Sequence, residues 1–350
     1  MSKLPAEWEA HSFSQIVWPS RNTDWEYMID EAVECFGRIL REIAKRERVV
    51  VVTDSLEWLR ESLGPLGIEG EVYAFETPIN DTWVRDYGLI TLVDETGKPE
   101  MLDFTFNGWG MKFAANHDNQ VSRRLAETAL PGIPIYHLTT VLEGGSIESD
   151  GSVLMTTSGC LLAPNRNEYR TEYDAIGDLS PIFRPRHFHF ITSGELVGDD
   201  TDGHVDTLAR FAPGNRIVYV KCYDEKDEHY ESLSKMEAEL KDFVNSENER
   251  YELVPLPLPT AIYDKDNGER LPATYANYYY VKGAILLPVY NVSTDKEAIE
   301  TMRRAFGPEG YEIVPVDCCA LIRQHGSLHC STMQYPSSVS LRTEKLTRIN

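Results

Sequence analysis

The chain has 350 residues, of which 42% are hydrophobic and 26% are charged, a composition typical of a globular protein of one or two domains. Acidic residues outnumber basic residues by 56 to 34, and the formal net charge at pH 7 is −22. This excess argues against nucleic acids and anionic membranes as partners, because both attract basic surfaces, and it favours a cationic ligand.

The N-terminus, MSKLPAEWEA, has no apolar stretch of the kind that signal peptides carry. The apolar runs of the chain are about the length of one strand, too short for a membrane-spanning helix. The six cysteines are Cys35, Cys160, Cys222, Cys318, Cys319 and Cys330, and they form no C-x-x-C motif. We therefore expect a cytoplasmic protein with free thiols, one of which is a candidate nucleophile.

The same order of elements recurs along the chain: an apolar strand, a polar turn, an amphipathic helix, a second strand and a polar loop. We expect the first strands to begin near Gln15, Leu89, Val153, Ile217 and Ile285, which are 74, 64, 64 and 68 residues apart. We expect the second strands at Val49, Ile135, His187, Leu253 and Ile313. Five α/β units of about 65 residues favour a closed ring over an ordinary mixed α/β domain with a chance periodicity.

The sequence patterns that predict helices between these strands differ in strength. The first helix carries Ile29, Phe36, Leu40 and Ile43 on one face. The third, around residues 169–176, is expected to have only one or two turns.

We expect residues 1–336 to form one domain and residues 337–350 to be a flexible tail.

Five polar segments recur at the spacing of the strands. They are NDTWVRDYG (Asn80–Gly88), LEGGSIE (Leu142–Glu148), DGHVD (Asp202–Asp206), LPATYANYYY (Leu271–Tyr280) and GSLHC (Gly326–Cys330). The intervals between Asp86, Glu143, His204, Pro272 and Cys330 are 57, 61, 68 and 58 residues. The shared spacing predicts equivalent positions in the five units, so that their side chains form one site near the axis of a ring.

A cysteine and a histidine in these segments are candidates for nucleophilic catalysis. Cys330 lies in a polar sequence, whereas Cys35 and Cys222 lie in apolar runs. A thiolate nucleophile needs a lowered pKa or a base within reach, and His204 is the best candidate base. In a strand, His329 would point to the opposite face from Cys330, and we interpret it as a packed or surface residue.

Three carboxylates, Asp86, Glu143 and Asp206, suit a delocalised cation. A guanidinium presents its N–H donors in one plane, which bidentate carboxylates match. Attack by Cys330 on the central carbon would expel ammonia and leave a covalent thiouronium adduct, which water would hydrolyse. A Cys/His pair also occurs in proteases, amidases and transglutaminases, but those enzymes need an oxyanion hole rather than a ring of carboxylates.

Other interpretations stay open. A metal-dependent hydrolase could use His204, Asp206 and Asp202, although no second histidine has zinc-like spacing to His204. A propeller that only binds ligands would need no nucleophile. Trp83 and Trp109 are either core aromatics or walls of a pocket for a flat cation, and core packing is favoured for Trp83.

The segments NDTWVRD, EGGSIE, DDTDGHVD, LPATYANYYY and GSLHC occur in this order, and through them the chain resembles the agmatine deiminases. This family belongs to the guanidino-modifying (pentein) superfamily, together with the arginine and peptidyl-arginine deiminases. The resemblance extends from Leu4 to Gln334. It implies a five-bladed α/β propeller, no metal or organic cofactor, and hydrolysis of agmatine to N-carbamoylputrescine and ammonia.

The resemblance also implies roles for individual residues. Cys330 falls at the position of the family's nucleophile, and His204 at that of the general acid and base. Asp86 and Asp206 match the carboxylates that hold the guanidinium. Glu143 matches a glutamate that orients His204 or contacts the substrate.

The same site would also fit peptidyl-arginine, free arginine or another guanidino compound. The N-terminus argues against a secreted peptidyl enzyme, and free arginine deiminases generally have a longer chain with an extra helical domain. Gln324 and His325 stand where the family usually has glycines. The expected partner is a small cationic guanidino substrate, and a homo-oligomer stays open.

Overall fold

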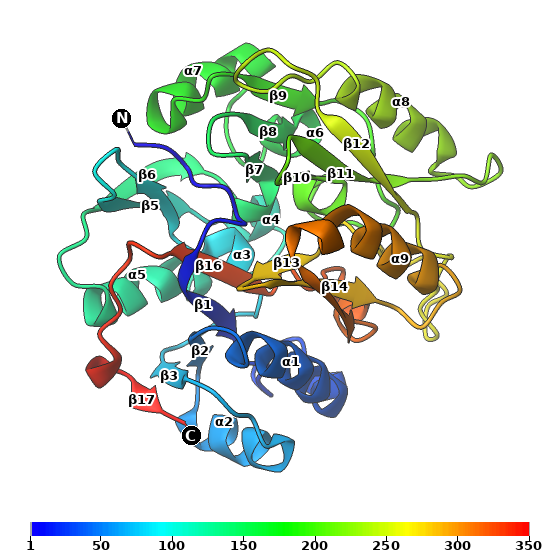
Figure 1. The fold of residues 1–350 in the computed structure, drawn as a ribbon. Coiled ribbons are helices and arrows are strands. Elements are labelled where there is room, and N and C mark those ends of the chain that lie inside the picture. The colour runs from blue at the N-terminus through cyan, green and yellow to red at the C-terminus, as the bar shows by residue number, and fades with distance from the viewer. Residues whose placement is uncertain (1, 350) are drawn as a thin grey trace.

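A computed structural model describes residues 2–349 as a mixed α/β fold whose strands form five sheets (Figure 1). Four sheets have three strands and one has five. In every sheet a middle strand pairs antiparallel with a short inner strand and parallel with an outer strand. An α-helix connects the middle strand to the outer one, as parallel pairing requires a crossover.

The first sheet joins the two ends of the chain. Its middle strand β1 (His11–Val17) pairs antiparallel with β16 (Thr332–Pro336) and parallel with β2 (Val49–Thr53). The helix α1 (Ile29–Ala44) connects β1 to β2 and buries the predicted apolar face, which includes Phe36 and Leu40. The sheet continues into β3 (Val72–Glu76), which follows α2 (Leu56–Leu63).

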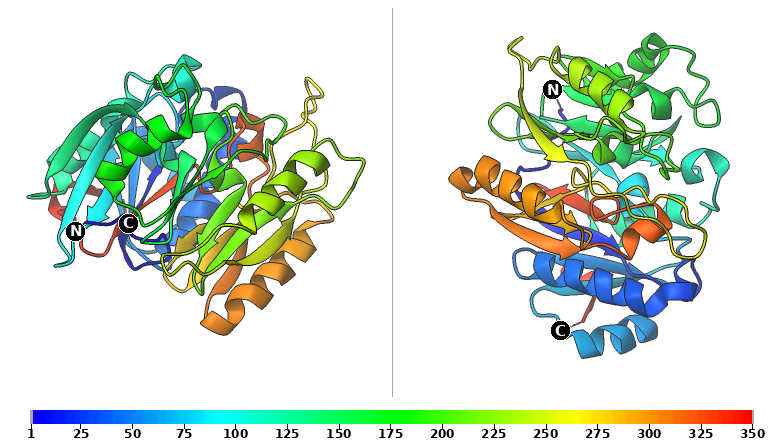
Figure 2. Two further views of the ribbon diagram at one scale, coloured as in Figure 1. Left: turned by 90° about the horizontal axis from the view of Figure 1, so that it is seen from above. Right: turned by 90° about the vertical axis from the view of Figure 1, so that its right-hand side faces the viewer.

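The other four sheets repeat this order. Their strands are β4 (Ile90–Val93), β5 (Pro99–Thr105) and β6 (Ile135–Val141); β7 (Ile147–Ser149), β8 (Leu154–Thr157) and β9 (Phe188–Ile191); β10 (Ala209–Ala212), β11 (Arg216–Lys221) and β12 (Glu252–Pro257); and β13 (Tyr279–Val281), β14 (Ala284–Val289) and β15 (Glu312–Asp317). Their connecting helices are α5 (Asp118–Ala129), α7 (Glu172–Phe183), α8 (Tyr230–Leu240) and α9 (Asp295–Phe306). The connecting helices lie on the outside of the molecule (Figures 1 and 2).

The structure differs from the sequence prediction at two elements. The apolar run at Leu89 is the short inner strand β4, and the middle strand of that unit is β5. The helix α7 has 12 residues, more than predicted, with a capping box from Thr171 and Asp174 at its start and Pro181 inside. It buries Leu179 and Phe183 in its last turns, so tertiary packing extends a helix whose local signal is weak.

The last residues also differ from the prediction of a flexible tail. The strand β17 (Thr347–Arg348) pairs antiparallel with β3 at the edge of the first sheet. Val339 is buried, and Leu346 and Ile349 pack against the largest hydrophobic cluster. The segment 337–349 therefore lies along the domain, because it buries apolar side chains and covers a sheet edge.

None of the helices in residues 2–349 is long and apolar enough to span a bilayer. The five repeated units match the predicted alternation of strands and helices. A closed five-bladed ring stays a prediction.

Candidate active site

The loops that lead into the short inner strands bring the predicted residues together. Asp86 lies in the short helix α3 (Val84–Tyr87) before β4, and Glu143 lies before β7. His204 and Asp206 precede β10, and Cys330 precedes β16. The convergence joins side chains as far as 124 positions apart in the sequence.

Asp86 is buried, and each of its carboxylate oxygens accepts a hydrogen bond. Oδ1 accepts from the main-chain N–H of Gly145 at 2.9 Å, and Oδ2 accepts from Nε1 of Trp109 at 2.9 Å. Trp109 has left-handed backbone angles, φ 54° and ψ 49°, in the short helix α4 (Gly108–Met111). Burial, opposed by the charge of His204 and supported by the charges of Asp206 and Glu143, raises the pKa of Asp86 to about 6.

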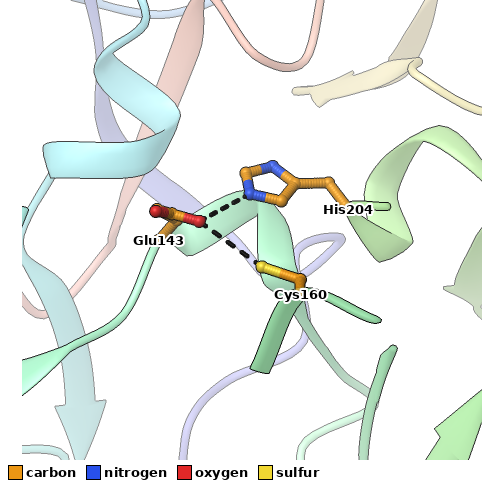
Figure 3. A group of neighbouring side chains, drawn as sticks. All are labelled: Glu143, Cys160 and His204. Atoms are coloured by element: carbon orange, nitrogen blue, oxygen red, sulfur yellow. Dashed lines mark hydrogen bonds and ion pairs between the residues drawn. The ribbon is translucent and has the colours of Figure 1, made fainter. Parts of the chain in front are cut away.

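His204 lies between two carboxylates. Its Nε2 is 2.9 Å from Oε2 of Glu143 (Figure 3). Its Nδ1 is 3.6 Å from Oδ1 of Asp86. Burial alone would lower the pKa of His204, but Asp86, Cys160 and Glu143 raise it well above the ordinary value. The imidazole therefore carries a proton at neutral pH and has the form that a general acid needs.

Glu143 contacts two further residues that the sequence analysis missed. Nε of Arg166 lies 2.9 and 3.0 Å from its two oxygens, and Sγ of Cys160 donates to Oε2 at 3.4 Å (Figure 3). Burial opposes ionisation, yet His204 and Arg166 together hold the pKa of Glu143 below its ordinary value. Arg166 lies between the second and third polar segments at no repeated spacing, so only its charge in a polar stretch of sequence marks it.

Asp206 has one occupied oxygen and one free oxygen. Oδ2 accepts from Nδ1 of His329 at 2.7 Å, whereas Oδ1 is buried and has no hydrogen-bond partner among residues 2–349. Burial would raise the pKa of Asp206, but the hydrogen bond and charge of His329 lower it overall. A buried acceptor without a donor is unfavourable, so this oxygen is suited to the N–H group of a ligand.

Cys330 points at the same oxygen of Asp206 that His329 contacts. Its Sγ lies 3.7 Å from Oδ2 of Asp206 and 3.4 Å from Oδ1 of Asn277. Burial raises the pKa of the thiol well above its ordinary value, and Asp206 and Asp86 add to this rise. In the free protein Cys330 is therefore a neutral thiol.

His329 is packed, as expected, but its contact with Asp206 was not predicted. His329 and Cys330 lie in a turn rather than in a strand, so both reach Asp206. Nε2 of His329 also lies 2.8 Å from Oε2 of Glu7, in the N-terminal segment. Asn277 was missed as well, although it lies in the fourth polar segment. Its Oδ1 accepts from the main-chain N–H groups of His329 at 2.9 Å and Cys330 at 3.3 Å.

A pocket of about 220 Å³ leads to Cys330 and Asp86. Its aromatic lining includes Trp83 and Trp109, both buried, so each is a core residue and a pocket wall at once. The carboxylates that line it are Asp24, Asp81, Asp86, Asp199 and Asp200.

Among residues 2–349, the three metal ligands proposed from the sequence do not form a group whose ligand atoms all lie within 4.8 Å of one another. Asp202 pairs with Arg166 at 2.6 Å and with Lys112 at 2.9 Å, and Asp206 pairs with His329. Both acids therefore have other partners, and the hypothesis of a site built from Asp202, His204 and Asp206 is wrong.

Gly145 lies where three of the side chains meet. A methyl group on its Cα would come within 2.6 Å of Nδ1 of His204, 2.8 Å of Oδ1 of Asp86 and 3.0 Å of Oδ2 of Asp206. We expect Gly145→Ala to displace these atoms, to lower kcat/KM for the substrate by about 100-fold and to destabilise the fold by about 1–3 kcal/mol. Steady-state kinetics and thermal unfolding would measure both effects.

The matched control is Gly177→Ala in helix α7, where a methyl group meets no atom within 4 Å. This change should leave kcat/KM unaltered and stabilise the helix by about 0.5–1 kcal/mol. Equal kinetics for both variants would contradict the close approach at Gly145.

Comparisons with known proteins identify the family to which the chain belongs. Residues 3–336 match the family described as Porphyromonas-type peptidyl-arginine deiminase. A "Putative agmatine deiminase" of Vibrio parahaemolyticus serotype O3:K6 is 31% identical over 353 residues, which span 95% of this chain and 96% of that protein.

Two solved structures are similar over almost their whole lengths. One is described as the putative arginine deiminase from Porphyromonas gingivalis, with a TM-score of 0.90, 43% identity and coverage of 97% of this chain and 100% of that one. The other is the C. jejuni agmatine deiminase with substrate bound, with a TM-score of 0.88, 32% identity and 98% coverage of each chain. The chain therefore belongs to the Porphyromonas-type peptidyl-arginine deiminase family, and its mixed α/β fold is that of an agmatine deiminase.

Proposed function

We propose that the protein is an agmatine deiminase, which hydrolyses the guanidinium of agmatine to N-carbamoylputrescine and ammonia through a covalent adduct on Cys330. The observation that carries this proposal is the buried carboxylate of Asp206, whose Oδ2 lies 3.7 Å from Sγ of Cys330 and whose Oδ1 is free. We also propose that the five units close into a ring within one domain of residues 1–336. The pairing of β16 with β1 supports closure, because it puts strands from both ends of the chain in one sheet.

The guanidinium would bind between Asp86 and Asp206. Two carboxylates offer acceptor oxygens to a planar set of N–H donors, and the free Oδ1 of Asp206 would gain its missing partner. The bound cation would also favour the thiolate form of Cys330, because burial and the same carboxylates otherwise raise the pKa of the thiol and keep it neutral.

The chemistry then needs a proton at the leaving nitrogen. The sulfur of Cys330 attacks the central carbon, and the C–N bond breaks as His204 donates the proton of Nδ1, the nitrogen that faces Asp86. Ammonia leaves, and the thiouronium remains on Cys330. His204, now neutral, takes a proton from water, whose oxygen attacks the same carbon and releases the thiolate and the urea-type product.

The lining of the pocket favours agmatine over free arginine. Asp24, Asp81, Asp199 and Asp200 attract a distal amine and repel an α-carboxylate. Arg323 lines the same pocket, but its guanidinium is 3.0 Å from Glu31 and lies near Asp264 and Asp266. The guanidinium of Arg323, which could otherwise bind an α-carboxylate, is thus already paired with acidic side chains.

A substrate panel tests this proposal. Release of ammonia and formation of a ureido product should be measured with agmatine, free arginine and an arginine-containing peptide at equal concentrations. We expect the highest kcat/KM for agmatine. Turnover of the peptide alone would replace the proposal with a peptidyl-arginine deiminase that uses the same site, and no turnover of any guanidino compound would overturn it.

Asp200 is the candidate partner of the distal amine. It lines the pocket four residues before His204, and burial raises the pKa of its carboxyl while the charges of His325 and Lys112 oppose this rise. We expect Asp200→Asn to raise the KM for agmatine about tenfold, the loss of about 1.4 kcal/mol of charge interaction, with kcat nearly unchanged. Methylguanidine, which lacks the amine, should show no such change, and an equal loss with both substrates would contradict this role.

The pH profile should show the ionisation of Asp86. Because burial raises its pKa to about 6, the carboxyl is neutral below that pH and cannot hold the cation. We expect kcat/KM to fall about tenfold per pH unit below about pH 6 and to level off above it. The pKa of Asp81 is also raised to about 6 by burial, so Asp81→Asn is the control: it should keep this acidic limb, and loss of the limb in that variant would assign it to Asp81.

A further inference from the structure

A thiol outside the proposed chemistry lies against the general acid. Cys160, in the short helix α6 (Ser158–Leu161), is buried and donates from Sγ to Oε2 of Glu143 at 3.4 Å. The same oxygen lies 2.9 Å from Nε2 of His204. One atom each of Glu143, Cys160 and His204 thus lies within 4.8 Å of the others (Figure 3).

These separations are close to those of a tetrahedral zinc site. Zinc bonds of about 2.0–2.3 Å to oxygen, nitrogen and sulfur put two ligand atoms about 3.3–3.6 Å apart. Oε2 of Glu143 is 2.9 Å from Nε2 of His204 and 3.4 Å from Sγ of Cys160, and the third pair, Cys160 and His204, lies within 4.8 Å. Small movements of these side chains would therefore bring the three atoms to the spacing of zinc ligands. Carboxylate, imidazole and thiolate are also the ligand types that zinc prefers.

We propose that Glu143, Cys160 and His204 form a binding site for Zn²⁺ or a similar thiophilic divalent cation, and that a metal bound there inhibits the enzyme. Binding is a proton exchange without a change of oxidation state. The metal replaces the proton on Sγ of Cys160 and the proton on Nε2 of His204, and both protons pass to solvent. The two charges of the metal replace two protons, so the net charge of the cluster does not change.

Arg166 is compatible with this site. Its Nε contacts both oxygens of Glu143, and its Nη1 and Nη2 are held by Asp202 and the carbonyl of Thr201. It can stay on Oε1 and orient the carboxylate while Oε2 binds the metal, as outer partners of metal ligands do. The acidic pocket gives a route for a cation as far as Asp86, whose Oδ1 is 3.6 Å from Nδ1 of His204.

A second acidic and histidine cluster lacks the feature that carries the proposal. Glu7, Glu148 and His329 also lie within 4.8 Å of one another, but they include no thiol. Arg210 contacts both glutamates, and Arg85 contacts Glu7. We expect no thiophilic metal to bind at this second cluster. A sulfur ligand in a metal complex of the protein would therefore distinguish the Cys160 site from it.

The inhibitory part rests on the proposed function, because a metal on Nε2 would replace the imidazolium of His204 with a metal-bound imidazole, whose Nδ1–H is a much weaker acid. The binding part does not, and it is tested on a chain that cannot turn over. Cobalt(II) should be titrated into the full-length Cys330→Ala protein and followed by absorption. We expect one site with visible bands of tetrahedral cobalt and a sulfur-to-cobalt charge-transfer band in the near ultraviolet, both displaced by Zn²⁺.

Two double variants assign the sulfur. Cys160→Ala in the Cys330→Ala background should lose the charge-transfer band and weaken zinc binding beyond the about 10–100-fold loss that outer-shell changes cause. Cys222→Ala in the same background removes another buried cysteine and should keep both. Circular dichroism and thermal unfolding would verify folding, and Cys160→Ser offers a smaller change if the alanine variant does not fold.

The absence of a thiolate–cobalt band in Cys330→Ala, or its survival in the double variant with Cys160→Ala, would overturn the proposed site. In the active enzyme we expect Zn²⁺ to abolish ammonia release reversibly, with recovery after addition of a chelator. A cobalt site in an enzyme that zinc does not inhibit would refute the inhibitory part. An inactive wild-type protein with an intact Cys160 band would refute the proposed function but not the site.

Discussion

Cys330→Ala is expected to lower the turnover of agmatine by about 10⁴-fold or more while the variant still binds agmatine. The sulfur is the only protein atom in the proposed scheme that forms a bond to the guanidinium carbon, so without it the remaining groups can accelerate only a much slower direct attack by water. Binding should survive because the cation is held by Asp86 and Asp206. Ammonia release measures the first effect, and calorimetric titration with agmatine measures the second.

Cys222→Ala is the matched control, because Cys222 is a buried free thiol that does not line the pocket. It should keep wild-type turnover. Turnover by Cys330→Ala within tenfold of the wild type would rule out the covalent scheme. A variant that neither turns over nor binds, although folded, would show that the thiol is part of the cation site.

His204→Asn is expected to lower kcat by about 10²–10⁴-fold, the range typical of the loss of a general acid. KM should change less, because Asp86 and Asp206 remain. The structure gives a second, independent readout: nearby acidic groups raise the pKa of His204 well above the ordinary value. Nitrogen NMR of the wild-type protein should therefore show this imidazole still protonated at pH 7.

The raised pKa of His204 also makes the stability of the folded protein depend on pH. A histidine whose pKa is raised on folding stabilises the protein fully below its unfolded value of about 6.5. That contribution is lost as the pH rises through the higher folded pKa. The wild type should lose stability relative to His204→Asn across this window. A neutral His204 at pH 6, or a pH-independent difference in stability, would contradict the acid role.

The repeated pattern of the sequence was sufficient to predict the mixed α/β fold and its five repeated units, but not all of the strands. Long apolar runs such as those at Val49 and Ile285 became β2 and β14, because a buried parallel strand needs an apolar residue on both faces. The inner strands β7 and β13 have 3 residues each and follow directly on polar loops. No periodicity can be recognised in so few residues, and pairing with the middle strand defines them.

The candidate site was predictable to the extent that its residues share the period of the repeat. Asp86, Glu143, His204 and Cys330 share it, and the structure brings them together with Asp206. Arg166 and Cys160 have no such spacing, and Glu7 lies in the N-terminal segment. They meet the site only because distant loops pack on one another, which a local pattern does not encode.

By itself, therefore, the sequence determined the unit of the fold, the acidic character of the ligand site and the residue types that carry the chemistry. Those properties follow from residue order and charge, which are local. Only the tertiary structure decided which oxygen of Asp206 is free, which nitrogen of His204 faces Asp86, and that residues 337–349 lie along β3. Those properties depend on burial and on contacts between residues more than 100 positions apart, so they arise only when the five sheets are packed together.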